Sequence, residues 1–90
     1  MTEAWDPFKA AANERKHGVR FADAAAVLFD PLALKLAEVD YGGEERLAVV
    51  GTDNCGRVVV VVYTHRGDTR RIISARRATR QERKQYEEGI

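Results

Sequence analysis

The chain has 90 residues, of which 44% are hydrophobic and 32% are charged, and its net charge at pH 7 is +1. These values indicate one soluble globular domain over residues 1–90. No apolar stretch approaches the ~20 residues that a membrane-spanning helix needs, and the N-terminus lacks the apolar core of a secretory signal. The single cysteine, Cys55, excludes an internal disulfide, so we expect a cytoplasmic protein that does not contact a membrane.

The first third of the chain predicts two helices. Asp6 is a suitable N-cap, Pro7 suits the first helical position and Gly18 is a typical C-terminal stop, so a helix is expected between them. A second helix is expected over residues 21–29, where apolar residues recur at helical spacing until Pro31. Both helices are short and rich in alanine, so tertiary packing must stabilise them.

After Pro31 the pattern changes to strands. Strands are expected over residues 32–39, 46–51, 57–66 and 69–77, with glycine-containing turns between them. Thr79 and Glu82 form a capping box, which begins a final helix that ends near Glu88. Two N-terminal helices, three or four antiparallel strands and one C-terminal helix predict an α+β fold, with the helices against one face of a small sheet.

The last two predicted strands form a hairpin whose register can be read. If Gly67-Asp68 is a two-residue turn, Arg66 lies opposite Thr69. Strict alternation then gives one apolar core face and one polar face, and a one-residue register error would exchange them. The predicted core face holds Val60, Val62, Ile73 and Ala75, and the predicted polar face holds Tyr63, His65, Arg70, Ser74 and Arg76.

Positive charge is concentrated on this hairpin and the helix that follows. Residues 57–84 hold nine Lys or Arg and two acids, whereas the rest of the chain holds six Lys or Arg and twelve acids. Arginine gathered on a rigid scaffold indicates a partner that is rich in phosphate or carboxylate.

The arginines at the hairpin's end are the first candidate site. Arg76 and Arg77 end a strand directly before a capped helix, with Arg66, Arg70 and Arg71 nearby. Guanidinium groups are permanently charged and fork-shaped, which suits a phosphodiester and its pentacoordinate transition state. The alternative is a solvated, charged strand edge that prevents aggregation.

Three other groups have two interpretations each. Lys16 and His17 close the first helix, where they can move a proton and steady negative charge, or simply cap the helix dipole. Tyr63 and His65 can stack a base, or Tyr63 packs at the sheet rim. The Glu44-Glu45-Arg46 run can supply a carboxylate base, or an ordinary ion pair. Two histidines and one cysteine, all scattered, predict no metal site, and no phosphate-binding loop occurs, so we expect no cofactor.

Three blocks of the sequence resemble one known family. They are WDPFKAAANERKHGV near the N-terminus, VVYTHRG in the hairpin and RIISARRATRQER at its end, and the likeness runs from Trp5 to Glu88. In this order the blocks are similar to the BrnT family of bacterial type II toxins. The resemblance implies a fold like that of the RelE and ParE toxins.

The same resemblance implies an activity and a partner. The known members of the BrnT family are ribonucleases that block translation, and a BrnA antitoxin holds them inactive. That antitoxin has a ribbon-helix-helix DNA-binding part, so we expect a complex with two copies of each protein. Operator DNA is then contacted only through the antitoxin.

By motif match, the resemblance implies site residues that are mostly basic. Those with an expected catalytic role are Lys16, His17, Arg66, Arg76 and Arg77. Those with an expected RNA-binding role are Arg46 and Tyr63, which match the family less strongly, and His65, Arg70 and Arg71, which are added from their own chemistry and position. Many members have a histidine just before the EER block, where this chain has Asp40-Tyr41-Gly42-Gly43, so any role of that histidine is missing here.

The expected chemistry needs no cofactor because RNA carries its own nucleophile, the 2′-hydroxyl. The enzyme has to align that hydroxyl with the phosphorus, stabilise the added charge and assist proton transfer. We expect a 2′,3′-cyclic phosphate product and no effect of EDTA, while the identity of the general base stays open. Two alternatives are a non-catalytic module that binds nucleic acid or protein, and a toxin directed at DNA gyrase.

Overall fold

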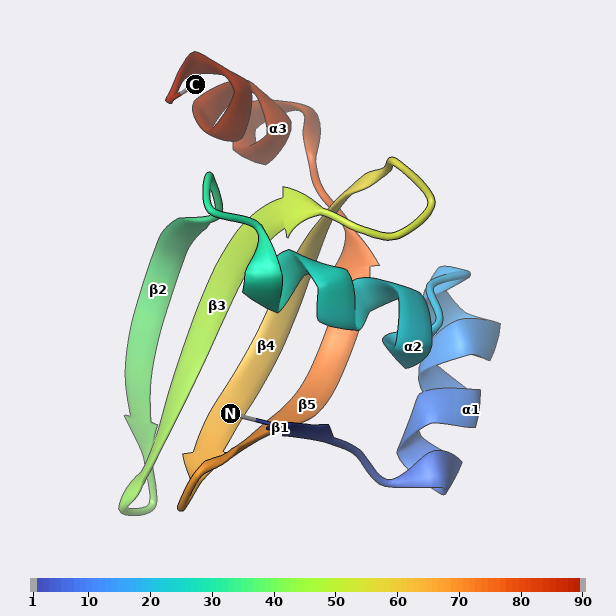
Figure 1. Cartoon of the computed structure of the whole chain (residues 1–90), viewed down its shortest axis with the longest axis vertical. Coiled ribbons are helices and arrows are strands. Elements are labelled where there is room, and N and C mark those ends of the chain that lie inside the picture. The colour runs from blue at the N-terminus through green and yellow to red at the C-terminus, as the bar shows by residue number, and fades with distance from the viewer. Residues whose placement is uncertain (1, 90) are drawn as a thin grey trace.

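Five strands form one sheet in the order β1-β5-β4-β3-β2 (Figure 1). This computed structural model describes residues 2–89. The strands are β1 (Thr2–Ala4), β2 (Leu34–Tyr41), β3 (Glu44–Thr52), β4 (Val58–Arg66) and β5 (Thr69–Arg77). The α+β class is confirmed, whereas the predicted count of three or four strands is wrong. β1 was missed because it has 3 residues and pairs with β5 in parallel, so it shows no alternating pattern of its own.

The helices follow the local signals in the sequence. In α1 (Pro7–His17) the Asp6 carboxylate accepts hydrogen bonds from two backbone N–H groups, and Gly18 ends the helix with φ +70°. The predicted second helix is a short α2 (Phe21–Ala24) that continues as a 3₁₀ turn, η1 (Ala25–Phe29). The capping box predicted for α3 (Arg80–Glu88) is confirmed, with both of its hydrogen bonds present. Within residues 2–89, no helix combines the length and the apolar character that crossing a membrane requires.

The prediction that all the helices cover one face of the sheet is wrong. Figure 1 shows α1 and α2 against one face, while α3 stands beyond the strand ends, where β3 and β5 terminate. Tyr86 is the buried residue of α3, and it packs against Val50 and Val60 on the face opposite to α1 and α2. The reason is that the first face is already covered, so the apolar ring of Tyr86 is buried on the second.

Two apolar clusters form the core, one on each side of the sheet. The larger cluster lies under α1, α2 and η1, and it includes Phe21, Val59, Val61 and Ile72. Trp5 packs on this cluster, and the centre of its ring lies 6.3 Å from that of Phe21 in an edge-to-face arrangement. The smaller cluster has three buried members, Val50, Val60 and Tyr86.

The β4–β5 register agrees with the prediction near the turn and departs from it further on. Arg66 lies opposite Thr69 and Tyr63 lies opposite Ile72, as predicted. A β-bulge then shifts the pairing between Val62 and Tyr63, so that Val62 faces Ser74. The prediction for the far half of the hairpin was therefore wrong, because a bulge adds one residue to one strand and strict alternation has no place for it.

The bulge exchanges the faces of the last β5 residues. Val61 pairs with Ala75, on the side of the larger cluster, and Val60 pairs with Arg76 on the other side. Arg76 and Ser74 therefore do not share a face with Tyr63. Since side chains alternate along a strand, Arg77 returns to the helix-covered side.

Candidate functional site

The face of the sheet away from α1, α2 and η1 carries a row of arginines. We define the open face by Arg46, Arg66, Arg71 and Arg76, with Val62 and Ser74 between them. Strand pairing fixes these positions, because Thr64 lies between Arg46 on β3 and Arg71 on β5, and Arg66 stands two residues further along β4. Of the helices in residues 2–89, α3 is the one that packs against this side, at the end that holds Arg76.

Two of these arginines share one carboxylate at the hairpin end of the open face. Glu44 lies 3.4 Å from Nη2 of Arg66 and 3.7 Å from Nε of Arg46. The Arg46 guanidinium carbon is 4.7 Å from the centre of the Tyr41 ring, and its buried Nε has no hydrogen-bond partner within residues 2–89. Arg71 forms no ion pair with any residue in that range. This end of the face therefore keeps an excess of positive charge.

Arg76, at the other end, is held by a carboxylate in a forked geometry. Its Nη1 and Nη2 donate to the two oxygens of Glu82 at 2.7 and 2.9 Å. The hydrogen bond from Arg76 is the main cause that lowers the pKa of Glu82 to about 2, and the same bond raises the pKa of Arg76. A planar fork of this kind matches phosphate as well as carboxylate, so Glu82 occupies the donors that an RNA phosphate would use.

Lys16, His17 and Arg77 lie at the same end of the molecule as Arg76. The buried Asn13 binds α1 to β5: its side-chain amide donates to the Ala75 carbonyl at 2.7 Å, and its oxygen accepts from the Ala75 N–H at 3.1 Å. Both elements run in the same direction from this contact (Figure 1). His17 is one helical turn beyond Asn13 and Arg77 is two strand residues beyond Ala75, which brings them to one edge of the helix-covered side.

Arg66 does not join this group. It pairs with Thr69 at the start of β5, eight residues before Arg77, which corresponds to roughly 26 Å along a strand. Of the five residues predicted to be catalytic, four lie at the end where β5 terminates and Arg66 lies at the opposite end of the open face. Bond formation at one phosphate therefore cannot involve Arg66 and Arg77 together in this arrangement.

The remaining predicted RNA-binding residues lie on the helix-covered side, beyond η1. The rings of Tyr63 and His65 meet edge to face, with centres 5.5 Å apart. Arg70 donates to Glu3 at 2.6 Å and to the Leu28 carbonyl at 2.9 Å, and its side chain is 13% exposed. Arg70 thus joins β5 to β1 and η1, and most of its guanidinium is engaged within the fold.

Two contacts near the site were not predicted from the sequence. The capping box predicted the contact of Glu82 with its own helix, but nothing in the spacing indicated its second role as the partner of Arg76. The second is a network in which the Tyr86 hydroxyl donates to Asp30 at 2.6 Å and lies 2.9 Å from the Thr52 hydroxyl. Burial alone would raise the pKa of Asp30, but the hydrogen bonds from Tyr86 and two backbone N–H groups outweigh it and lower that pKa.

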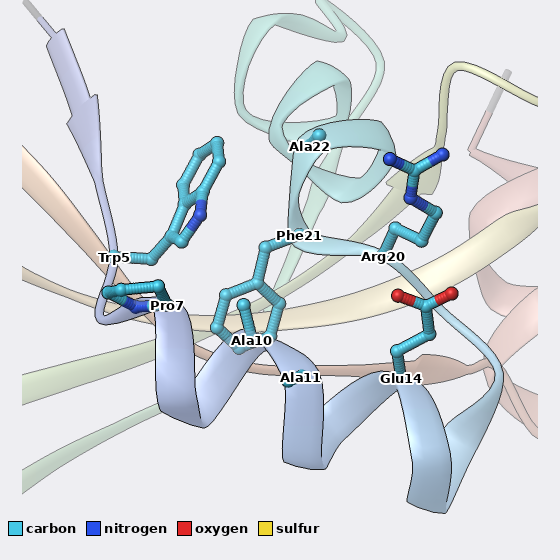
Figure 2. A pocket seen from close by; sticks show the side chains of 8 residues that line it. All are labelled: Trp5, Pro7, Ala10, Ala11, Glu14, Arg20, Phe21 and Ala22. Atoms are coloured by element: carbon cyan, nitrogen blue, oxygen red, sulfur yellow. The ribbon is translucent and has the colours of Figure 1, made fainter.

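A pocket of about 270 Å³ lies between α1 and α2, and none of its eight lining residues is a predicted site residue (Figure 2). Figure 2 shows the rings of Trp5 and Phe21 at one end and the charged groups of Glu14 and Arg20 at the other. Within residues 2–89, no three His, Cys, Asp or Glu side chains are grouped so that they would hold a metal ion.

Comparison with known proteins gives the family. The family model described as "Ribonuclease toxin, BrnT, of type II toxin-antitoxin system" matches residues 5–82. The chain belongs to the BrnT family. The crystal structure of the Brucella abortus ribonuclease toxin BrnT is similar to it, with a TM-score of 0.67 and 27% sequence identity over 89% of this chain and 100% of that one. No curated protein sequence matches the chain.

Family membership confirms part of the sequence-based interpretation. BrnT proteins are ribonuclease toxins of type II toxin–antitoxin systems, so ribonuclease activity and a protein antitoxin are properties of the family. The solved BrnT structure supports the α+β architecture described above. The individual site residues stay predictions.

Proposed function

We propose that this BrnT protein is a metal-independent endoribonuclease that acts in the cytoplasm, where it cleaves RNA and blocks translation. A BrnA-type antitoxin with a ribbon-helix-helix part neutralises it in a complex of two copies of each protein, which contacts operator DNA through the antitoxin. The observation that carries the catalytic part is the gathering of permanent positive charge along the open face and at the end of β5.

The open face is suited to hold the RNA backbone. Arg46, Arg66 and Arg71 at one end and Arg76 at the other place guanidinium groups along a single side of the sheet, with a mostly apolar floor between them. Arginine contacts to phosphate contribute affinity without sequence preference and weaken as salt rises. Tyr63, His65 and Arg70, on the helix-covered side, would have to meet a different part of the RNA.

The chemistry is assigned to the end of β5. The 2′-oxygen attacks the adjacent phosphorus, the bond from phosphorus to the 5′-oxygen breaks, and the products are a 2′,3′-cyclic phosphate and a 5′-hydroxyl. One proton leaves the 2′-hydroxyl and one is delivered to the departing 5′-oxygen, and His17 or Lys16 is placed to assist. Arg76 and Arg77 stabilise the extra negative charge on the pentacoordinate phosphorus.

Arg76 can take this role only by exchanging partners. Its two terminal nitrogens are bound to Glu82, so a phosphate has to displace that carboxylate or share the guanidinium with it. Arg77 forms no ion pair within residues 2–89 and is exposed, so it needs no such exchange. We therefore assign the larger catalytic effect to Arg77.

RNA end-mapping with purified protein tests the proposal. We expect 2′,3′-cyclic phosphate ends in the presence of EDTA, a loss of roughly 100-fold in rate for Arg77→Ala, and a smaller loss for His17→Ala. Arg83→Ala is the matched control, because Arg83 is an exposed arginine on α3 that forms an ion pair with Glu87 of the same helix. Products with 5′-phosphate ends, inhibition by EDTA, or full activity of Arg77→Ala would contradict the mechanism.

A further inference from the structure

The two edges of the sheet differ in how far they are protected. At one edge β1 has 3 residues and leads directly into α1. At the other edge β2 has 8 residues, and no strand within residues 2–89 pairs with its outer side. A long free edge presents unpaired backbone N–H and C=O groups that an extended segment of another chain can use.

Half of β2 is regular enough to be a pairing surface. A bulge interrupts the register between Lys35 and Ala37, and from Ala37 to Tyr41 the pairing with β3 is unbroken. In this regular half Val39 is 53% exposed and Tyr41 is 66% exposed, both on the side of the open face. Apolar side chains left in water along a free strand edge indicate a surface that a partner covers.

The other side of the same half is acidic. Glu38 and Asp40 lie there, with Glu45 beside them on β3. The neighbouring Glu38 carboxyl group, through its hydrogen-bonding interaction and its charge, raises the pKa of Glu45. Lys35 lies 2.9 Å from Glu38, and His65 lowers the pKa of Glu45 only slightly against these causes. The three carboxyl groups thus lack sufficient positive charge of their own, and a basic group from a partner would stabilise them.

We propose that an extended segment of the antitoxin adds to the sheet along Ala37–Tyr41. Its apolar residues cover Val39 and Tyr41, and its alternate residues place Lys or Arg against Glu38, Asp40 and Glu45. Such strand addition combines backbone hydrogen bonds with side-chain specificity on both faces. This inference rests on the proposed antitoxin partner.

Charge decides against two other occupants. Two copies of this chain paired through β2 would bring six carboxyl groups together, from Glu38, Asp40 and Glu45 of each copy, against two Lys35. RNA phosphates would meet the same acidic edge and be repelled. A basic, extended protein segment is the occupant that the charges favour.

Hydrogen exchange and binding of a BrnA-type antitoxin test the proposal. We expect the amides of Ala37–Tyr41 to exchange roughly tenfold more slowly in the complex than in the free toxin. Asp40→Lys should weaken antitoxin binding roughly tenfold and leave RNA cleavage by the free toxin unchanged. Glu88→Lys makes the same charge change on an exposed position of α3 and should bind as wild type does.

The outcomes separate the two proposals. A stable complex in which the Ala37–Tyr41 amides exchange as in free toxin, with Asp40→Lys binding at wild-type affinity, overturns strand addition and leaves the antitoxin assignment intact. No complex at all overturns the antitoxin assignment and this inference with it. Val39→Lys, at a solvent-exposed position, gives an independent check and should weaken binding without unfolding the toxin.

Discussion

The two faces of the sheet differ in role: one holds most of the buried core, and the other carries a row of arginines. On the helix-covered face, Val59, Val61 and Ile72 are sealed under α1, α2 and η1, and Asn13 satisfies backbone groups that would otherwise be buried unpaired. On the open face, the buried cluster is smaller, with Val50, Val60 and Tyr86 of α3, and four arginines lie along the same face. Because stability is concentrated on one face, the other is free to carry charge that would weaken a core.

The β5 bulge is what divides these roles. Without it, Arg76 would point toward the side that holds Tyr63 and Ala75 would point away from the larger cluster. With it, Ala75 stays in the core under α1, and Arg76 reaches the open face next to α3. One extra residue therefore separates the two neighbouring arginines onto two faces while both remain at the end of the same strand.

The largest expected effect on the free energy of unfolding comes from substituting one of two adjacent isoleucines. Ile72 is 1% exposed within the larger cluster, whereas Ile73, which the bulge leaves without a partner on β4, is half-buried and is a member of neither cluster. We expect Ile72→Ala to lower the free energy of unfolding by about 3–4 kcal/mol and Ile73→Ala to lower it by about 1 kcal/mol. Urea denaturation of both variants measures the difference, and equal losses would contradict the conclusion that stability is concentrated in the larger cluster.

The ion pair that holds α3 gives an intermediate effect that depends on pH. In the folded protein Arg76 holds the pKa of Glu82 at about 2, whereas the unperturbed value is 4.5. The stabilisation by this ion pair is therefore complete above pH 4.5 and is lost as the pH falls toward 2. After allowance for the solvent exposure of Arg76, we expect a contribution of about 1–2 kcal/mol. Denaturation of wild type and Glu82→Gln across this range checks it. A wild-type curve no steeper than that of the variant would refute the prediction.

A surface arginine gives the smallest expected effect on stability and sharpens the contrast most. Arg71 pairs with no acid within residues 2–89, so Arg71→Ala should change the free energy of unfolding by less than about 0.5 kcal/mol. The same change should weaken RNA binding roughly fivefold and reduce its salt dependence. Filter binding at several salt concentrations measures the RNA affinity and its salt dependence. Unchanged RNA affinity would remove Arg71 from the proposed interface.

Local signals in the sequence were sufficient for much of the fold. Asp6 and Gly18 set the ends of α1, and the box of Thr79 and Glu82 set the start of α3, since each depends on neighbours a few residues away. The type of turn at Gly67 also follows from local chemistry, because its φ of +60° suits glycine in a two-residue hairpin. These elements were therefore predicted correctly.

What the sequence could not supply were contacts between distant segments. β1 depends on a parallel partner 67 positions away, and the bulge depends on how β5 meets both β4 and α1. The prediction of the candidate site was the least accurate, because one shifted residue reverses the face of every side chain that follows it in the strand. Arg76 and Arg77 were identified by composition and motif, but their separation onto two faces, and the engagement of Arg70 with Glu3, required three-dimensional coordinates.

The central claim is that RNA lies on the open face and reaches the end of β5, and NMR titration with a 2′-O-methyl RNA tests it most directly. Such RNA lacks the nucleophilic hydroxyl and therefore binds without being cleaved. We expect saturable shifts in the guanidinium signals of Arg46, Arg71 and Arg76, with Arg70 unchanged. Shifts centred on Arg70, Tyr63 and His65, with the open face unaffected, would contradict the account.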